Sequence, residues 1–251
     1  MSAIVFVGPT LPVEIAQKQL DAVYLPPAAQ GDVYRAAQRS PSIIGVIDGY
    51  FANVPAVWHK EILWALSRGI RVFGSASIGA LRAAELALFG MEGIGAIYQA
   101  YAAGALEDDD EVAVMHGPGE VGYAALSEAM VNIRATLANA EAHGAISAAV
   151  RRQLVGIAKQ TFFPQRTYEN IVGKMDDGGP AWRQELIARL LQHRIDQKQA
   201  DAIAMLREIR ARLEAGLPPA QVDFQLQRSL TFERLVATIE ESSDPDPAPG
   251  R

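Results

Sequence analysis

The chain has 251 residues, 49% of them hydrophobic and 21% charged, with a formal net charge of −6 at pH 7, which is typical of a globular protein and argues against general nucleic-acid binding. No apolar run is long enough to cross a bilayer and the N-terminus lacks the zones of a signal peptide, so we predict a cytoplasmic protein that binds neither a membrane nor nucleic acid. The chain contains no cysteine, which excludes disulfides, thiolate metal sites and any mechanism that carries sulfur on the protein as a cysteine persulfide.

Strand and helix signals alternate in the first half of the chain. Apolar runs ended by turn residues predict strands over residues 3–7, 22–25 and 42–47, a run that ends at 72–73, and a later strand over 112–115. Helical patterns cover residues 14–19, 32–39, 54–68, with Asn53 as the cap, and 78–89. The alternation predicts a Rossmann-like α/β fold, in which helices flank a parallel sheet.

From residue 127 the pattern becomes helical, without an intervening strand. We therefore divide the chain into an α/β core over residues 1–126, a helical C-terminal part over 127–241 and a disordered tail over 242–251. Within the helical part, the aromatic cluster Phe162-Phe163-Pro164, with Arg166 and Tyr168, is interpreted as a helix end that packs on the core, and a surface for a partner also remains open.

The loops that follow the strands are the expected place for a ligand, because ligands bind beyond the carboxyl ends of parallel strands. Three loops should meet there, namely Gly8-Pro9-Thr10, Asp48-Gly49-Tyr50 and Ser75-Ala76-Ser77. His59 and Lys60 lie in a helix that starts at the same edge, and His116 ends the later strand. The sequence thus predicts hydroxyls, a carboxylate and candidate bases around one crevice.

Ser77 stands where the strand ending at Phe73 turns into the next helix. This position predicts the helix N-cap, beside backbone N–H groups that attract an anion. The run from Ser75 to Gly79 also differs by one residue from the G-x-S-x-G elbow of nucleophilic serines, because Ser75 replaces the first glycine. A helix cap and a reactive serine therefore both remain open.

Arg82 and Glu85 are the charged residues of the helix that follows, whose other residues are Ala, Leu, Ile, Gly and Phe. Three positions apart, they can meet on one face of the helix. In apolar surroundings two charges must pair or serve a ligand. A structural ion pair and a functional pair both remain open.

The acidic run from Glu107 to Glu111 is interpreted as a solvated loop, although one or two of its carboxylates can suit magnesium. Nothing in its spacing requires a metal. The phosphate-binding patterns G-x-x-x-x-G-K-[ST] and G-x-G-x-x-G after the first strand are both absent. We therefore predict neither a bound metal nor a cofactor.

Several of these segments, in this order, resemble the core of the TfuA-like family. They are residues 5–10 (VFVGPT), 48–51 (DGYF), 59–63 (HKEIL), 74–86 (GSASIGALRAAEL), 90–91 (GM) and 109–113 (DDEVA). The resemblance covers about the first half of the chain, and the conserved order of several segments makes it more specific than any single motif.

The resemblance implies a partner of YcaO proteins, which use ATP to replace a peptide-backbone oxygen with sulfur in ribosomally made peptides or in a methanogenic enzyme. It also implies how the sulfur is supplied: the C-terminal thiocarboxylate of a small ubiquitin-like carrier is hydrolysed and the sulfide is passed on. The expected partners are therefore a YcaO protein and the thiocarboxylated carrier, and a homo-oligomer is also open.

Thiocarboxylate hydrolysis is an acyl transfer, which needs a nucleophile or activated water, a base and donors for the oxyanion. On this resemblance Ser77 is the nucleophile or an oxyanion-site residue, and the backbone N–H of Ile78 donates to the oxyanion. His59 or Lys60 is the base.

The remaining polar residues hold or orient the reactants on the same reading. Arg82 holds the carboxylate or sulfide of the carrier, and Asp48 or Glu85 orients the base or the arginine. The ligand-binding edge is completed by Gly8, Thr10, Gly49, Ser75 and His116.

Two other classes of function remain. In the first, the protein is a non-catalytic adaptor that binds YcaO and activates it allosterically, so that the crevice is an interface and Arg82 and Glu85 are structural. In the second, the loop edge binds a nucleotide, against which the missing phosphate motifs count.

Overall fold

The five strands of the first half form one parallel sheet in the computed structural model, which describes residues 2–50, 54–175 and 178–242. The strands are β1 (Ala3–Phe6), β2 (Val23–Leu25), β3 (Ile43–Val46), β4 (Arg71–Ser75) and β5 (Glu92–Ile94). They lie in the order β2-β1-β3-β4-β5, and every neighbouring pair is parallel. The predicted parallel α/β architecture is confirmed.

The central strands are buried on both faces, as their continuous apolar runs predict. All four residues of β1 and of β3 are buried, whereas the edge strands β2 and β5 are partly exposed. The strand β5 has no counterpart among the strands predicted from the sequence. Its three residues include one glycine and one glutamate, so no apolar run marks it, and pairing with Phe73, Gly74 and Ser75 of β4 holds it in place.

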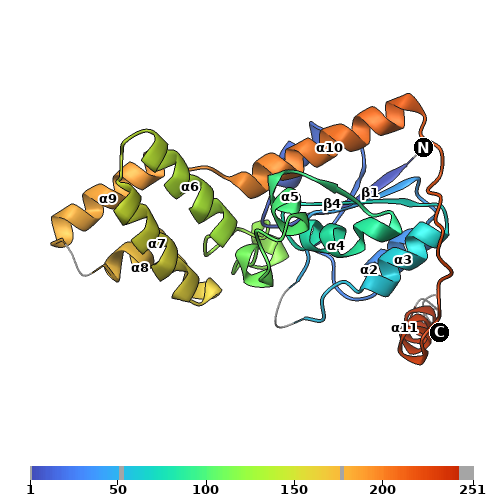
Figure 1. Ribbon diagram of the computed structural model, residues 1–251. Helices are drawn as coiled ribbons and strands as arrows, with labels where there is room; N and C mark the ends of the chain where they lie inside the picture. Colours follow the sequence, from blue (N-terminus) through green and yellow to red (C-terminus); the bar gives the residue numbers. More distant parts are fainter. Residues whose placement is uncertain (1, 51–53, 176–177, 243–251) are drawn as a thin grey trace, which may run out of the picture.

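Helices cover both faces of the sheet (Figure 1). One face packs against α2 (Asp32–Gln38), α3 (His59–Ser67) and α4 (Ile78–Leu86), which follow the strands in turn. The other face packs against α1 (Val13–Gln17) and α10 (Gln197–Ala215), a long helix from the C-terminal part. The buried apolar residues of α10, from Ala202 to Ile209, thus complete the core on this face of the sheet. The division of the chain after residue 126 stays a prediction.

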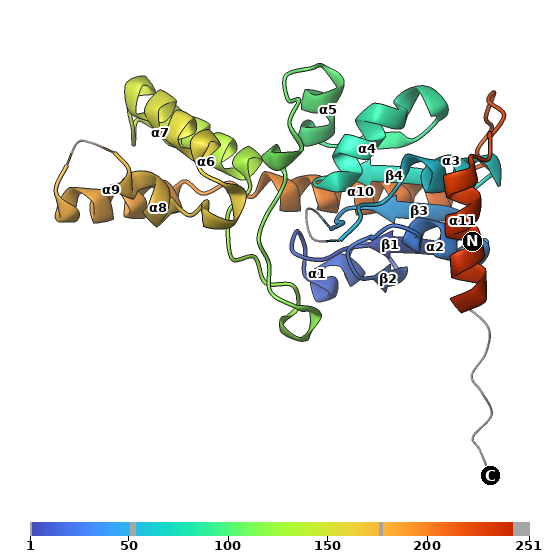
Figure 2. The same cartoon turned by 90° about the horizontal axis from the view of Figure 1, so that it is seen from below.

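The remaining helices lie at two ends of the sheet. A group with its own apolar core lies beyond the carboxyl edge, formed by α6 (Met130–Ala142), α7 (Ala148–Gln160), α8 (Tyr168–Gly173) and α9 (Pro180–Gln192). The helix α11 (Leu230–Ser242) packs on Tyr34 of α2 and Trp64 of α3 (Figure 2). Shorter elements are α5 (Ala96–Ala102) and the 3₁₀ turns η1 (Ala87–Phe89), η2 (Asp109–Glu111), η3 (Gly119–Val121) and η4 (Phe163–Gln165). Across the described residues, no helix has both the length and the apolar character that crossing a bilayer requires.

Two predicted helix boundaries are corrected. The helix expected from residue 54 begins at His59, because Pro55 and Ala56 pair with the chain after β2, and the Trp58 N–H donates to the Glu61 carboxylate (3.0 Å). The predicted cap Asn53 and the residues of the tail from 243 on lie outside the described residues. The helix expected to reach Phe89 ends at Leu86 and continues as η1.

The predicted strand over residues 112–115 is not a strand. Its apolar residues Val112 and Ala113 are buried, and Val112 packs in a cluster with Ile97 and Tyr101 of α5 and with Val131 at the start of α6. His116 forms only an isolated antiparallel bridge, with Ala125, within the described chain. The apolar run therefore indicates burial for its first two residues, whereas Val114 is half-buried and Met115 is exposed. Within the described chain, residues 112–115 pair with no strand.

Gly79 lets the start of α4 approach the sheet closely, and its replacement tests this contact. A Cβ at Gly79 would overlap the backbone carbonyl of Val46 in β3, which cannot move away. We expect Gly79→Ala to lower the free energy of unfolding by about 2–3 kcal/mol. Gly156 of α7 is the control: a Cβ there meets nothing within 4 Å, so Gly156→Ala should stabilise the protein by up to about 1 kcal/mol. Urea denaturation measures both, and equal effects would contradict the close approach.

Candidate active site

A cavity of about 400 Å³ opens at the carboxyl edge of the sheet. It is lined by Pro9, Asp48, Gly49, Tyr50, Val54, Ser77, Val114, Met115, His116, Phe162, Phe163 and Pro164. The strand order reverses between β1 and β3, which is the switch point where parallel sheets bind ligands. Of the residues predicted to form a site, the structure brings Asp48, Gly49, Ser77 and His116 into this cavity.

Asp48 forms the floor of the cavity and ties it to the loop after β1. Its Oδ2 accepts hydrogen bonds from the backbone N–H groups of Gly8 (2.9 Å) and Thr10 (3.0 Å), and its Oδ1 accepts one from the Thr10 hydroxyl (2.6 Å). Only 1% of Asp48 is exposed. Because all three partners donate, the carboxyl group acts here as an acceptor, as an ionised carboxylate does. Gly8 and Thr10 therefore contribute through Asp48.

Ser77 follows a tight turn at the end of β4. The Ser77 N–H donates to the Ser75 carbonyl (2.7 Å) and Ala76 has a φ of 63°, so the chain makes a γ-turn around Ala76. A non-glycine residue with positive φ is strained, and such strain gathers at functional sites. The strained residue is thus the one before Ser77. Ser75 lies outside the cavity lining, with its hydroxyl donating to the Ile94 carbonyl (2.7 Å).

Ser77 occupies the predicted N-cap position of α4, but its side chain does not cap the helix. Within the described part of the chain its hydroxyl makes no hydrogen bond, although the residue is 2% exposed and lines the cavity. The Gly79 N–H donates to the Ile47 carbonyl (3.3 Å), whereas the Ile78 N–H has no acceptor among the described residues. A free hydroxyl and a free backbone donor therefore meet at a helix start, where an anion is stabilised.

His116 faces the same cavity with one ring nitrogen available. Its Nδ1 lies 2.8 Å from the Gly117 carbonyl oxygen, which can only accept, so Nδ1 carries a proton. In the neutral ring Nε2 is then the acceptor. The rings of Tyr50 and Tyr123 lie beside the imidazole, with centroids 5.9 and 5.7 Å away. His116 is thus the histidine placed to accept a proton inside the cavity.

The other predicted site residues form a separate group outside the cavity lining. The Oε2 of Glu85 accepts hydrogen bonds from His59 Nε2 (2.8 Å) and Arg82 Nη1 (2.6 Å), and Arg82 Nε donates to the Val57 carbonyl (3.1 Å). Partial burial raises the pKa of the Glu85 carboxyl, but the hydrogen bonds from His59 and Arg82 outweigh it and lower that pKa overall. The Lys60 ammonium donates to the Gln227 carbonyl (2.8 Å). These contacts join α3, α4 and the segment before α11.

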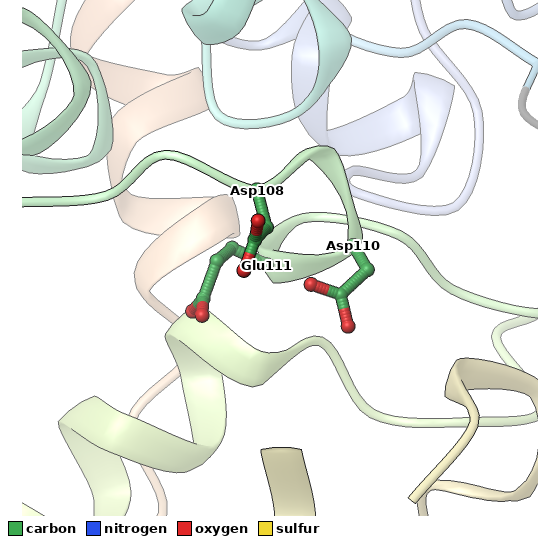
Figure 3. Close-up of side chains that lie close together, drawn as sticks. All are labelled: Asp108, Asp110 and Glu111. Atoms are coloured by element: carbon green, nitrogen blue, oxygen red, sulfur yellow. The ribbon is translucent and has the colours of Figure 1, made fainter. Parts of the chain in front are cut away.

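The acidic run is a solvated loop only in part: Glu107, Asp108 and Asp109 are exposed, whereas Asp110 is half-buried and Glu111 is buried in an ion-pair network. The side chains of Asp108, Asp110 and Glu111 lie close together (Figure 3), and the ammonium group of Lys159 contacts all three. Arg134 of α6 holds Glu111 through two hydrogen bonds of 2.9 Å. The carboxylate geometry alone would suit a cation, but the lysine already supplies that charge. The prediction of a solvated loop is wrong for Asp110 and Glu111, because the basic residues that pair with them lie far along the sequence.

This ion-pair network predicts that the protein loses stability in acid. Burial raises the pKa of the Glu111 carboxyl, but hydrogen bonds from Arg134 and Lys159 outweigh it, so the pKa lies below its ordinary value of 4.5. The unfolded chain therefore takes up this proton at a higher pH than the folded chain, and stability is lost as the pH falls below about 4.5. We expect Glu111→Gln to be less stable than wild type at pH 7 and to lose less stability between pH 5 and 3. Chemical denaturation at each pH measures this, and parallel pH profiles would contradict it.

Two parts of the site were missed from the sequence. The wall formed by Phe162, Phe163 and Pro164 comes from the helical part, where the sequence indicates only a helix end that packs on the core. Its position is set by Arg166, which is fully buried and bonds to Asp110, so the wall and the acidic run are linked. The second is Lys198, a buried lysine near Asp48. A lone lysine within a helical pattern gives no signal of burial.

Comparison with known proteins supports the same region. Residues 48–167 match the family model described as TfuA-like protein. Every residue that lines the cavity except Pro9 falls inside this range. The match starts later than the resemblance noted above and extends further, through the helices α6 and α7 to the wall at Phe162–Pro164. A search of curated proteins found no match. The chain therefore carries a TfuA-like region over residues 48–167, and this region holds the cavity.

Proposed function

We propose that this protein releases sulfide from the C-terminal thiocarboxylate of a ubiquitin-like carrier, for use by a YcaO protein in peptide-backbone thioamidation in the cytoplasm. The TfuA-like match is consistent with an accessory role beside YcaO. One observation supports the hydrolytic step above all: Ser77 and His116 line a single cavity, and among the described residues the Ser77 hydroxyl makes no hydrogen bond and the His116 Nε2 has no partner. The N–H of Ile78, the next residue after Ser77, has no acceptor in the same described part of the chain.

The chemistry divides into two acyl transfers. The Ser77 Oγ attacks the thiocarboxylate carbon while His116 Nε2 takes the hydroxyl proton. The Ile78 N–H and the start of α4 stabilise the oxyanion, and the C–S bond breaks as sulfide leaves with the proton from His116. Water, deprotonated by His116, then cleaves the acyl-serine ester. The net reaction consumes one water, converts the thiocarboxylate to a carboxylate and releases hydrogen sulfide.

His116 replaces His59 and Lys60 as the proposed base because it lines the cavity with Ser77, whereas the other two are bonded elsewhere. Two features of the cavity lining favour acyl transfer over phosphate chemistry. Phe162 and Phe163 wall the cavity, and none of its described lining residues is a lysine or arginine. The ATP that thioamidation consumes is therefore assigned to the YcaO partner.

An assay with YcaO separates this function from that of an adaptor. With the thiocarboxylated carrier as sulfur source, thioamide formation should require this protein. When inorganic sulfide is supplied instead, YcaO should form thioamide equally well without it. A protein that still stimulates YcaO when sulfide is in excess acts as an allosteric adaptor, and the hydrolytic proposal would then be abandoned.

A further inference from the structure

Lys198, in the first turn of α10, lies behind the cavity floor and joins three segments of the chain. Its Nζ donates to the Val112 carbonyl (2.9 Å) and lies 4.0 Å from Asp48 Oδ1. Its backbone N–H donates to Asn132 Oδ1 of α6 (3.0 Å). Only 3% of Lys198 is exposed, so these contacts are made away from solvent.

Lys198 supplies the positive charge that the buried carboxylate of Asp48 requires. A buried carboxylate is strongly unfavourable without a counter-charge. Among the described residues, Lys198 is the cation within ion-pair distance of Asp48. Burial lowers the pKa of the Lys198 ammonium group, and the carboxylates of Asp48, Asp196 and Glu128 oppose that shift.

The two reacting groups of the site come from segments that no strand pairing joins. Ser77 and Asp48 belong to the sheet edge, whereas His116 ends the irregular segment that starts at Val112. Ser127 holds that segment by accepting a hydrogen bond from the Met115 N–H (2.8 Å), but Ser127 precedes α6 and does not belong to the sheet. Lys198 supplies a polar link between the segment and the sheet edge.

We propose that Lys198 is a positioning residue of this site. Its ammonium group holds the Asp48 carboxylate and the Val112 carbonyl at a fixed separation, and so sets the distance between Ser77 and His116. Lys198 touches neither reacting group in this role. Its catalytic consequence rests on the function proposed above, but the geometric claim does not.

Replacement of Lys198 by methionine, which has a similar length and no charge, tests both the geometric claim and its catalytic consequence. In Lys198→Met we expect amide hydrogen exchange to rise about tenfold or more in residues 8–10 and 112–116, whereas the buried strands β1 and β3 keep their protection. The kcat for sulfide release should fall about a hundredfold while KM changes little, because misplaced reactants slow the chemical step. Exchange that rises equally everywhere would mean a general loss of stability and would overturn the proposal.

The absence of cysteine from the chain permits a chemical rescue. In Lys198→Cys the new thiol is the only one, so the unfolded chain can be alkylated there and refolded. Alkylation with 2-bromoethylamine restores an ammonium group at nearly the length of lysine, and iodoacetamide adds a neutral amide as the matched control. We expect the aminoethylated protein alone to recover slow exchange in both segments and the wild-type kcat.

The outcomes keep the two proposals apart. If wild type releases no sulfide, the proposed function fails, and exchange in the two segments still decides the role of Lys198. If both alkylated forms behave alike, or if neither refolds while wild type does under the same treatment, the ammonium group does not position the site. Unchanged exchange in Lys198→Met would also overturn the inference, even if sulfide release fell.

Discussion

Sulfide release should fall about a thousandfold or more in Ser77→Ala, because loss of the nucleophile leaves only binding and oxyanion stabilisation. The fold should be unaffected. The Ser77 hydroxyl makes no capping hydrogen bond, and alanine retains the backbone geometry of the helix start. Initial rates of sulfide formation from a thiocarboxylated carrier, together with thermal melting, measure both effects.

Ser147 provides the matched control for this prediction. It is also a helix N-cap, but its hydroxyl does accept a hydrogen bond, from the Val150 N–H (3.3 Å). We expect Ser147→Ala to cost about 1 kcal/mol of stability and to leave sulfide release unchanged. Ser77→Ala should therefore reduce sulfide release without reducing stability, and Ser147→Ala should reduce stability without reducing sulfide release. A folded Ser77→Ala protein that works at the wild-type rate would remove Ser77 from the mechanism and favour direct attack by water.

The second large effect is expected at Arg166, which anchors the aromatic wall. Its guanidinium group is fully buried and donates to the Asp110 carboxylate (2.8 Å) and carbonyl (2.9 Å), and also to the Ala158 carbonyl (3.1 Å). Arg166→Met should lower the free energy of unfolding by about 3–5 kcal/mol, because it leaves these acceptors without their buried donor. Denaturant titration measures the loss.

Arg189 of α9 is the control for charge alone. It pairs with Glu185 on an exposed face of the helix, so Arg189→Met should change stability by about 0.5 kcal/mol or less. Equal losses in the free energy of unfolding for the two arginine variants would mean that the buried contacts of Arg166 do not stabilise the protein more than an exposed ion pair does. The wall at Phe162–Pro164 would then need another anchor.

The sequence predicts those parts of the fold that short apolar runs and turn residues determine. Continuous apolar runs gave the central strands β1 and β3, and the turns after them placed Asp48 and Ser77 at one edge of the sheet. The strand β5 was missed because backbone pairing with β4 forms it without an apolar run. The run 112–115 was misjudged for the opposite reason, since burial alone does not distinguish a strand from an extended loop.

The site itself depends more on distant contacts than on motifs. The acidic run itself gives no sign that Asp110 and Glu111 are paired, because their partners Arg134, Lys159 and Arg166 follow much later in the chain. Lys198 comes from a helix that returns to the sheet after the helical group α6–α9, a path that periodicity cannot show. The family resemblance indicated the region, and the fold decided which of its polar residues share a cavity.

Sulfide release by the purified protein alone tests the central claim most directly. A thiocarboxylated ubiquitin-like carrier is incubated with the protein in the absence of YcaO, and free sulfide and the intact mass of the carrier are followed together. The account predicts one sulfide for each carrier that exchanges its terminal sulfur for oxygen, at a rate far above that of Ser77→Ala. Sulfide formation no faster with wild type than with Ser77→Ala would contradict it.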